Sequence, residues 1–280
     1  PSEYPLVFQY LIEGMQAPLI YDLNPQECLE AIKTAGVIFL LDFNALDRID
    51  KMGETVMFSK ATKILIDHHI DPEPIADFIL SDTKASSTSE MVYLFMRDLG
   101  MLERLDIQMG EALFTGLITD TGSFRYSTRG LTYQIAGELK NIGVDDYALS
   151  NLIFNSLEPK NLKLLGHCLA NRMVLLTEHK AAYIFLTKDD YQQFGISRGD
   201  TEGIVNYLLM MKDIVLAALI TEQPSIIKIS LRSKDDINVQ QMAAAHFNGG
   251  GHKNASGGSA YAKLDDVINR FTKVVPNFVK

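Results

Sequence analysis

Cysteine, tryptophan and long apolar runs are scarce or absent in this chain of 280 residues. It has two cysteines, Cys28 and Cys168, and no tryptophan. Two thiols outside a Cys-x-x-Cys pair cannot form the disulfide framework of a small secreted domain. No apolar stretch approaches the ~20 residues that a membrane-spanning helix needs. These features favour a reducing compartment, and we expect a cytoplasmic protein without a membrane partner.

Positive charge is also scarce. The chain has 26 Lys and Arg against 35 Asp and Glu, a formal net charge of -9. Binding of a long nucleic acid depends on many Lys and Arg contacts to its phosphates, so long duplex nucleic acid is not an expected partner. An anionic ligand must then be held by bound cations or by a few local Arg and His residues. The 47% hydrophobic content suffices for one large core or two modest ones.

Two short apolar runs end abruptly in residues that suit metal binding. Residues 36–41 run into Asp42, and residues 63–66 run into Asp-His-His at 67–69. Such runs are typical of buried parallel strands, and ligands bind beyond the carboxyl ends of these strands. Carboxylate together with imidazole suits Mn²⁺, Zn²⁺ or Fe. A lone Asp at a strand end is usually a turn or cap residue, but the triplet combined with a second Asp favours a metal site.

The order of these runs predicts a parallel sheet in the first half of the chain. A helix over 25–32 precedes the strand at 36–41, a helical stretch over 45–58 precedes the strand at 63–66, and another strand is expected over 75–80. Strands and helices that alternate in this way form βαβ units.

Two helix ends carry further polar residues. Ser87 and Glu90 have the spacing of a capping box, although hydroxyls and amides at a helix N-terminus also suit an anion. Spacing alone favours the capping interpretation. The nearly all-apolar helix over 110–119 is followed by Asp120, a third carboxylate at the end of a buried element. Taken alone, Asp120 is better explained as a turn residue beside Gly122.

The second half of the chain has a different pattern, which predicts a separate domain. Its apolar runs pair as two antiparallel hairpins; they cover residues 173–178, 181–186, 214–222 and 226–231. We place a first domain at 1–155, a linker helix at 156–171 and a smaller domain at 172–280. The expected fold class is α/β, with a parallel-sheet domain followed by a smaller α+β domain.

The second domain has a polar cluster of its own. The strand at 226–231 leads into Arg232 and Ser233, and three glycines at 249–251 precede His252. Glycine allows positive φ and close approach of a ligand, and successive N–H groups can form an anion-binding nest. Arg and His add charge-assisted hydrogen bonds to phosphate. A flexible loop is the alternative, but the His-Lys-Asn that follows the glycines favours a phosphate or nucleotide site.

In this order the motifs resemble those of the DHH/DHHA1 phosphoesterase family, along nearly the whole chain. The motifs that carry the resemblance are Asp42-Phe43-Asn44, Asp67-His68-His69, Ser86-Ser87-Thr88-Ser89-Glu90, Asp120-Thr121-Gly122 and Gly249-Gly250-Gly251-His252. The resemblance implies a DHH domain over 1–155 and a DHHA1 substrate-binding domain over 172–280. Within the family, the chain is most similar to the bacterial nano-RNase/pAp phosphatase branch, also known as exopolyphosphatase-related proteins.

The resemblance implies two Mn²⁺ ions at the carboxyl edge of the sheet and a role for each motif. Asp42 would bridge both ions, and His68 and Asp120 would bind one of them. His69 would face the scissile phosphate as a catalytic group, with Asp67 supporting it. The residues implied to grip the terminal phosphate of the substrate are Arg232, Ser233, Gly250, Gly251 and His252.

One family motif has no match. The His-x-x-Pro-Asp-x-Asp loop, which supplies three further metal ligands in the family, and the strand before it are not found ahead of Asp42. Because the chain begins at Pro1 rather than Met, we expect an N-terminal segment of the domain to be missing from it. In this chain we therefore expect one retained Mn²⁺ ion or none.

The expected function is Mn²⁺-dependent hydrolysis of very short oligonucleotides, adenosine 3′,5′-bisphosphate (pAp), or both, through two-metal activation of water. Neighbouring alternatives are cleavage of linear diadenylate, exopolyphosphatase activity and pyrophosphatase activity. A nucleotide-binding regulatory protein with a degenerate metal site is an alternative of a different class, and the unmatched loop is the argument for it. The resemblance also allows a homodimer.

Overall fold

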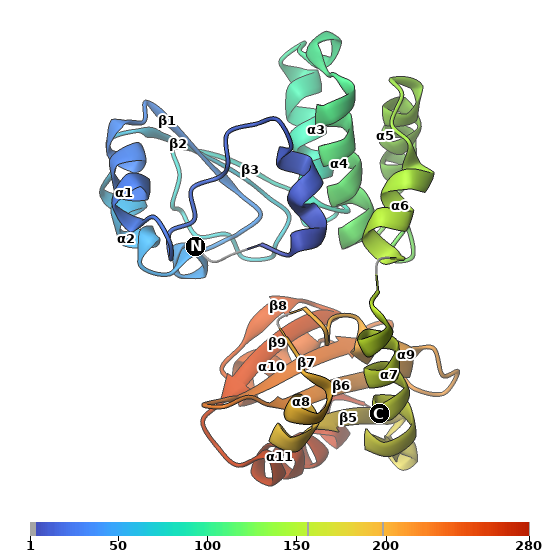
Figure 1. The fold of residues 1–280 in the computed structure, drawn as a ribbon. Helices are drawn as coiled ribbons and strands as arrows, with labels where there is room; N and C mark the ends of the chain where they lie inside the picture. The colour runs from blue at the N-terminus through green and yellow to red at the C-terminus, as the bar shows by residue number, and fades with distance from the viewer. Residues whose placement is uncertain (1–3, 156, 198, 280) are drawn as a thin grey trace. The chain divides into compact units, whose positions relative to one another are not determined.

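Two compact units make up the chain in the computed structural model, which describes residues 4–155, 157–197 and 199–279 (Figure 1). The units are Pro1–Ser156 and Leu157–Lys280. The first contains a three-stranded parallel sheet, and the second contains a six-stranded mixed sheet. The predicted α/β class, with a parallel sheet first and an α+β unit second, is confirmed. No helix in the described ranges is long and apolar enough to cross a bilayer.

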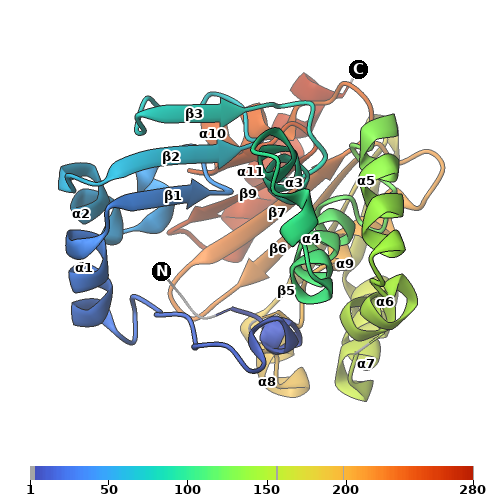
Figure 2. The ribbon, with the colours of Figure 1, turned by 90° about the horizontal axis from the view of Figure 1, so that it is seen from above.

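The sheet of the first unit has the strand order β1-β2-β3. Its strands are β1 (Val37–Leu41), β2 (Thr62–Asp67) and β3 (Phe78–Ser81). Leu41 pairs with Ile66, so β1 and β2 end at nearly the same level. All three arrows point the same way in Figure 2. The polar residues that follow β1 and β2 therefore emerge at one edge of the sheet.

Helices cover both faces of this sheet. On one face, Leu40 and Leu65 pack with Val56 in a cluster that α1 and α2 contribute to. On the other face, Ile66 packs against Met91 of α3, as the period of two along a strand requires. The helices of this unit are α1 (Pro25–Thr34), α2 (Met52–Phe58), α3 (Thr88–Asp98), α4 (Ile107–Asp120), α5 (Gly130–Asn141) and α6 (Asp146–Phe154), with 3₁₀ turns at Leu6–Ile12, Leu46–Ile49 and Leu102–Arg104.

The second unit has the strand order β4-β5-β6-β7-β9-β8. Its strands are β4 (Met173–Leu176), β5 (Ala181–Leu186), β6 (Leu216–Glu222), β7 (Ile227–Ser233), β8 (Gly250–His252) and β9 (Ala255–Ala260). The two predicted hairpins, β4–β5 and β6–β7, are confirmed as antiparallel. The sequence pattern did not reveal that β5 and β6 pair in parallel. A parallel pair needs a crossover, and α8 (Lys188–Phe194) and α9 (Ile204–Leu209) lie within it.

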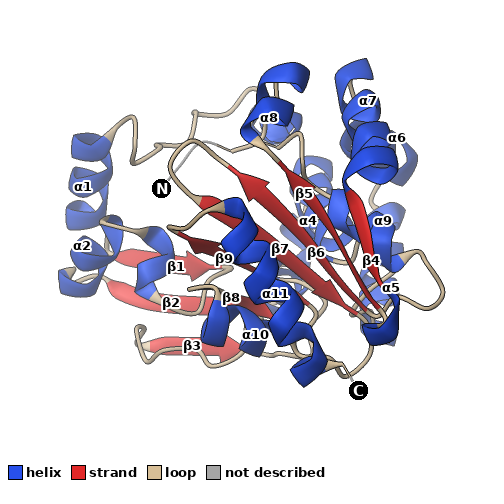
Figure 3. Ribbon diagram, turned by 90° about the horizontal axis from the view of Figure 1, so that it is seen from below, coloured by secondary structure: helices blue, strands red, loops and turns tan. Residues whose placement is uncertain are grey.

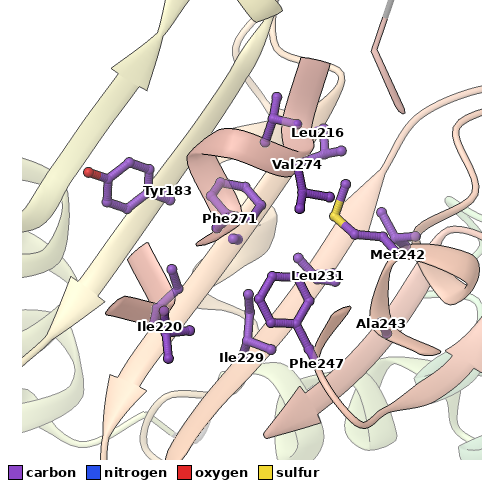
Figure 4. Packing of buried hydrophobic residues seen from close by; sticks show 14 of the residues in the cluster. Tyr183, Leu216, Ile220, Ile229, Leu231, Met242, Ala243, Phe247, Phe271 and Val274 are labelled. Carbon is purple, nitrogen blue, oxygen red and sulfur yellow. The ribbon is translucent and has the colours of Figure 1, made fainter. Parts of the chain in front are cut away.

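Both faces of the larger sheet are buried by helices. Figure 3 shows α10 (Val239–His246) and α11 (Leu264–Phe278) over one face, where Phe247 and Phe271 pack against Leu231 (Figure 4). On the other face, α9 and α7 (Pro159–His167) pack against alternate residues of β5 and β6. Full burial of a Phe or Leu side chain contributes about 1.5–3 kcal/mol, so each face has a substantial core of its own.

A buried carboxylate joins α7 to α8. Asp190 accepts two hydrogen bonds from Arg172, both at 2.9 Å, one from the His167 ring at 2.8 Å, and others from the amide and hydroxyl of Thr187. Burial alone would raise the pKa of Asp190, but the bonds from Arg172 and Thr187 outweigh it and lower the pKa to about 2. Asp190 is therefore ionised and holds these helices in place.

Three predicted elements have different bounds. The helical stretch expected over 45–58 is divided into a 3₁₀ turn and α2, since a Cβ on Gly53 would lie 2.4 Å from the Leu46 carbonyl oxygen and glycine lets the two segments touch. The strand expected over 75–80 begins only at Phe78. The helix expected over 156–171 begins at Pro159, where the fixed φ of proline suits a first helical position, and it ends in a π-helical turn at Cys168–Arg172.

The glycine-rich segment is a hairpin rather than a flexible loop. Gly250–His252 form β8, which pairs with β9. A Cβ on Gly249 would lie 1.9 Å from the Gly257 carbonyl oxygen, and one on Gly251, at φ 135°, would lie 2.7 Å from that of Ala255. Close backbone contact therefore requires glycine at 249 and 251, whereas Gly250 faces open space. An anion nest is not needed to explain these two glycines.

This packing predicts different outcomes for two neighbouring glycines. Gly249→Ala should lower the free energy of unfolding by about 1–3 kcal/mol, because the new methyl group forces the hairpin backbone apart. Gly250→Ala is the matched control and should change it by less than about 0.5 kcal/mol. Urea denaturation of both variants measures this difference, and equal destabilisation would contradict the steric explanation.

Candidate metal centre

Three potential ligands from three different elements meet at the carboxyl edge of the first sheet. Asp42 follows β1, His68 follows β2, and Asp120 is the last residue of α4. Nε2 of His68 lies 3.5 Å from a carboxylate oxygen of Asp120 and 3.7 Å from one of Asp42. One ligand atom of each residue lies within 4.8 Å of the others. Atoms about 2.1 Å from a shared ion lie roughly 3–3.5 Å apart, so a small inward adjustment fits a divalent cation.

The backbone at Asp42 has an unusual conformation. Its φ is 66°, in the left-handed region that few non-glycine residues other than Asp and Asn adopt. Its amide donates to the carbonyl oxygen of Ile66 at 3.3 Å, which extends the β1–β2 contact by one residue. Backbone strain of this kind often marks functional positions. At Asp42 it occurs where the chain leaves the sheet and the carboxylate meets His68.

Asp67 and His69 form a tightly bonded pair beside these ligands. The fully buried Asp67 accepts from Nδ1 of His69 at 2.7 Å and from the His69 amide at 3.1 Å. Burial alone would raise the pKa of Asp67, but the bonds and charge of His69 outweigh it and lower that pKa. Burial would lower the pKa of His69, and Asp67 reverses this and raises it. Ligand atoms of Asp42, Asp67 and His69 also lie within 4.8 Å of one another, so Asp42 belongs to both groups.

The charges at this edge favour a bound cation. Desolvation by the surrounding protein, followed by the negative charge of Asp42, raises the pKa of Asp120 to about 6, although 40% of its side chain is accessible to solvent. Two carboxylates held this close repel each other. A divalent ion between them would remove the repulsion, and oxygen and imidazole donors match the preferences of Mn²⁺ and Zn²⁺. The residues present therefore fit a metal ion.

Two of these potential ligands, His68 and Asp42, are contacted by the segment that contains Ala85 and Thr88. Nδ1 of His68 lies 3.2 Å from the carbonyl oxygen of Ala85, and the hydroxyl of Thr88 donates to Asp42 at 2.8 Å. Such contacts orient metal ligands and fix the tautomer of a histidine. The sequence pattern gave no sign of the Thr88 contact, since its hydroxyl-rich stretch was better explained by helix capping.

The capping box predicted at α3 is confirmed for Ser87 but not for the Glu90 side chain. The Ser87 hydroxyl accepts from the amide of Glu90 at 3.1 Å, as an N-cap should. The carboxylate of Glu90, however, accepts from Ser86, Thr132 and Arg129. Nothing in the sequence pointed to Arg129, because it lies 39 residues away from Glu90.

Two basic residues of the second unit stand in one row of its sheet. Arg232 on β7 pairs with Ala255 on β9, and Ala255 pairs with His252 on β8. Directly paired residues face the same side of a sheet. Arg232 and His252 are therefore roughly 10 Å apart across two strand spacings, with the small Ala255 between them. One guanidinium nitrogen of Arg232 also donates to the carbonyl oxygen of Leu231 at 2.9 Å.

The neighbouring polar side chains of this unit have internal partners. The buried hydroxyl of Ser233 donates to the carbonyl oxygen of Ile237 at 2.7 Å and accepts from Asn254 at 2.9 Å. Lys253 pairs with Asp236 at 2.8 Å. These contacts give Ser233 a part in holding the hairpin, and its contact with substrate stays a prediction.

The proximity of the two carboxylates can be tested without metal. Asp42→Asn should lower the pKa of Asp120 from about 6 toward 3.8, because it removes a neighbouring charge and Asn also tolerates a left-handed φ. Carbon-13 NMR of the carboxyl groups in metal-free protein measures this shift. Asp98→Asn, at the exposed end of α3, is the control and should leave Asp120 unaffected. An unchanged Asp120 in Asp42→Asn would mean that the carboxylates are not neighbours.

Comparisons with known proteins identify the family of the chain. The profile of the DHH family, N-terminal domain, matches residues 6–117, and that of the DHHA1 domain matches residues 178–280. The bifunctional oligoribonuclease and PAP phosphatase NrnA of Bacillus subtilis is 32% identical over 229 residues, which are 81% of this chain and 71% of that protein. A probable NrnA of Streptococcus mutans is 32% identical over 205 residues, 72% of this chain and 64% of its own length.

A solved structure of similar sequence has the same fold. The crystal structure of an exopolyphosphatase-related protein from Bacteroides fragilis has a TM-score of 0.94 to this chain at 35% identity, and the match covers 99% of this chain and 82% of that one. The two profiles follow the order of the two units along the chain. This chain, with its DHH domain followed by a DHHA1 domain, belongs to the DHH/DHHA1 phosphoesterase family and is a phosphohydrolase.

Proposed function

We propose that this enzyme hydrolyses phosphate esters of very short oligonucleotides and of pAp in a Mn²⁺-dependent reaction. The observation that carries the proposal is the meeting of Asp42, His68 and Asp120 at one sheet edge. The NrnA relatives, which bear the name oligoribonuclease and PAP phosphatase, support the choice of substrate. A phosphohydrolase needs positive charge beside the scissile phosphate, and these acidic residues would hold it as a metal ion.

The geometry of these side chains supports the proposed ligand roles. Asp42, His68 and Asp120 would hold one divalent ion. The family resemblance also assigns Asp42 to a second ion, whereas His69 and Asp67 are proposed to act on the phosphate rather than as ligands. When bound, such ions lower the pKa of a coordinated water and stabilise charge on the phosphoryl oxygens. The protein's own part is to keep His68 with its Nε2 toward the carboxylates and to hold Asp42 in its strained turn.

His69 is the group that we propose to face the scissile phosphate. Asp67 holds its Nδ1–H and favours the protonated ring, which raises the pKa of His69 above its ordinary value. A protonated imidazole can donate from Nε2 to a phosphoryl or leaving oxygen. Burial of Asp67 keeps the pair together and restricts the rotation of the ring.

Terminal recognition is proposed for the second unit, with residues 172–280 as the substrate-binding domain. Arg232 and His252 flank a small residue in one row, a spacing that suits a phosphate held by charge-assisted hydrogen bonds. The backbone at Gly250 and Gly251 would add amide donors. Two basic side chains can neutralise about one terminal phosphate. A short ligand with a free end is therefore favoured over a long strand.

Polyphosphate is the second candidate substrate. The Bacteroides fragilis protein at 35% identity is described as exopolyphosphatase-related, and a terminal phosphate is common to both substrates. Recognition of a nucleoside would separate the two candidates, because polyphosphate offers no base or ribose.

A length series tests the proposal directly. With Mn²⁺ at one salt concentration, the full-length wild type should hydrolyse dinucleotides and pAp at least roughly tenfold faster than a long single strand, measured as kcat/KM. Arg232→Ala should raise KM and lower kcat/KM for the short substrates roughly tenfold or more, because it removes binding rather than metal chemistry. Lys253→Ala is the matched control, since Lys253 is already paired with Asp236.

His68→Ala completes the experiment. It should abolish hydrolysis in a variant that still folds, because His68 lies outside the apolar run of its strand. The melting temperature should fall modestly, because the side chain is only 9% exposed and contacts the Ala85 carbonyl oxygen. Substantial activity in the folded variant would exclude His68 as a ligand. Equal kcat/KM on long strands and dinucleotides would indicate an exonuclease without end recognition, and hydrolysis of polyphosphate alone would favour the second candidate.

A further inference from the structure

The segment from Asp82 to Glu90 controls two of the three potential metal ligands. The carbonyl oxygen of Ala85 can only accept a hydrogen bond, so its 3.2 Å contact with His68 requires the proton on Nδ1. In the neutral ring, Nε2, which lies near the carboxylates of the centre, is then the unprotonated nitrogen that a metal ion needs. The position of this segment therefore sets the tautomer of His68.

The same segment also fixes the carboxylate of Asp42. The Thr88 hydroxyl donates to one of its oxygens at 2.8 Å. Thr88 is buried, so its hydroxyl has little access to water that could replace this bond. A shift of the segment would disturb Asp42 and His68 together.

One guanidinium fastens both ends of this segment. Arg129, the residue before α5, donates to Asp82 at 2.9 Å through Nη1 and to Glu90 at 2.6 Å through Nε, and its Nη2 forms an ion pair with Glu90 at 2.5 Å. Asp82 is the first residue of the segment and Glu90 the last. A planar guanidinium holds two carboxylates in a fixed relative orientation, which the flexible ammonium of lysine cannot do.

Glu90 is more deeply buried than helix capping requires. Its side chain is 0% exposed, and it also accepts from the hydroxyls of Ser86 at 2.7 Å and Thr132 at 2.6 Å. The Glu of a capping box bonds the N-cap amide, whereas this carboxylate is directed to an ion cluster. A buried ion pair adds little stability compared with apolar packing. The geometry that this ion pair imposes on the segment is therefore the contribution to consider.

We propose that Arg129 and Glu90 are positioning residues of the metal centre. Their ion pair locks the segment so that the Ala85 carbonyl and the Thr88 hydroxyl keep His68 ready to bind a metal ion. The inference rests on the proposed function, because it takes His68 as a ligand. Neither Arg129 nor Glu90 touches the ion or the substrate in this scheme, and both act through the segment.

The test determines which ring nitrogen of His68 carries the proton in metal-free, full-length protein. Proton–nitrogen correlation NMR at alkaline pH, assigned with His68→Gln, should show the Nδ1-protonated tautomer in the wild type. Arg129→Lys and Glu90→Gln should give a mixture of tautomers and weaken Mn²⁺ binding roughly tenfold or more in calorimetry. Arg97→Lys, a surface arginine of α3 that pairs with Asp98, is the matched control and should change neither quantity.

Folding is measured separately, by thermal denaturation in EDTA. Asp82→Asn is a milder variant at the partly exposed end of the cluster, and it should also give a mixture of His68 tautomers. It replaces Glu90→Gln in the test if that variant does not fold. A wild-type tautomer together with wild-type Mn²⁺ affinity in folded Arg129→Lys and Asp82→Asn would overturn the proposal. A wild type that neither binds Mn²⁺ nor hydrolyses nucleotides would instead refute the proposed function, and the tautomers alone would then decide whether the cluster positions His68.

Discussion

Repulsion between two carboxylates around one imidazole is the constraint on which the first unit depends. Asp42 and Asp120 reach His68 from different elements. Desolvation, followed by the negative charge of Asp42, raises the pKa of Asp120, so keeping both carboxylates ionised here is unfavourable without a cation. A fold can keep such groups together only if their elements are fixed by other interactions. Cores on both faces of the sheet hold β1 and β2, and the Thr88 hydroxyl restrains Asp42 directly.

The parts of the centre that the sequence predicts are those at the ends of apolar runs. Asp42 and His68 follow buried strands, and the ends of parallel strands share an edge, so their meeting follows from strand order. Thr88 and Arg129 could not be found this way. Thr88 contacts Asp42 across 46 residues, and Arg129 contacts Asp82 across 47. No local period records contacts of such separation, because they depend on the packing of α3 and α5.

The second unit shows a different limit of the sequence. Three consecutive glycines are compatible with a flexible loop, an anion nest or a crowded hairpin, because each needs a residue without Cβ. The structure separates these explanations position by position, since crowding accounts for Gly249 and Gly251 but leaves Gly250 open. The parallel pairing of β5 and β6 was hidden for another reason: antiparallel and parallel strands have the same apolar pattern when both faces are buried.

The two units carry positive charge in different ways, and this difference has a chemical consequence. In the first unit, Arg129 is committed to Asp82 and Glu90, so its charge stabilises the segment behind the ligands rather than a substrate. In the proposed function, a metal ion held beside Asp42 and Asp120 would act together with His69 to supply the positive charge that a phosphate needs at this edge. In the second unit, Arg232 and His252 stand in one row of the sheet, and they are the side chains proposed to recognise a terminal phosphate.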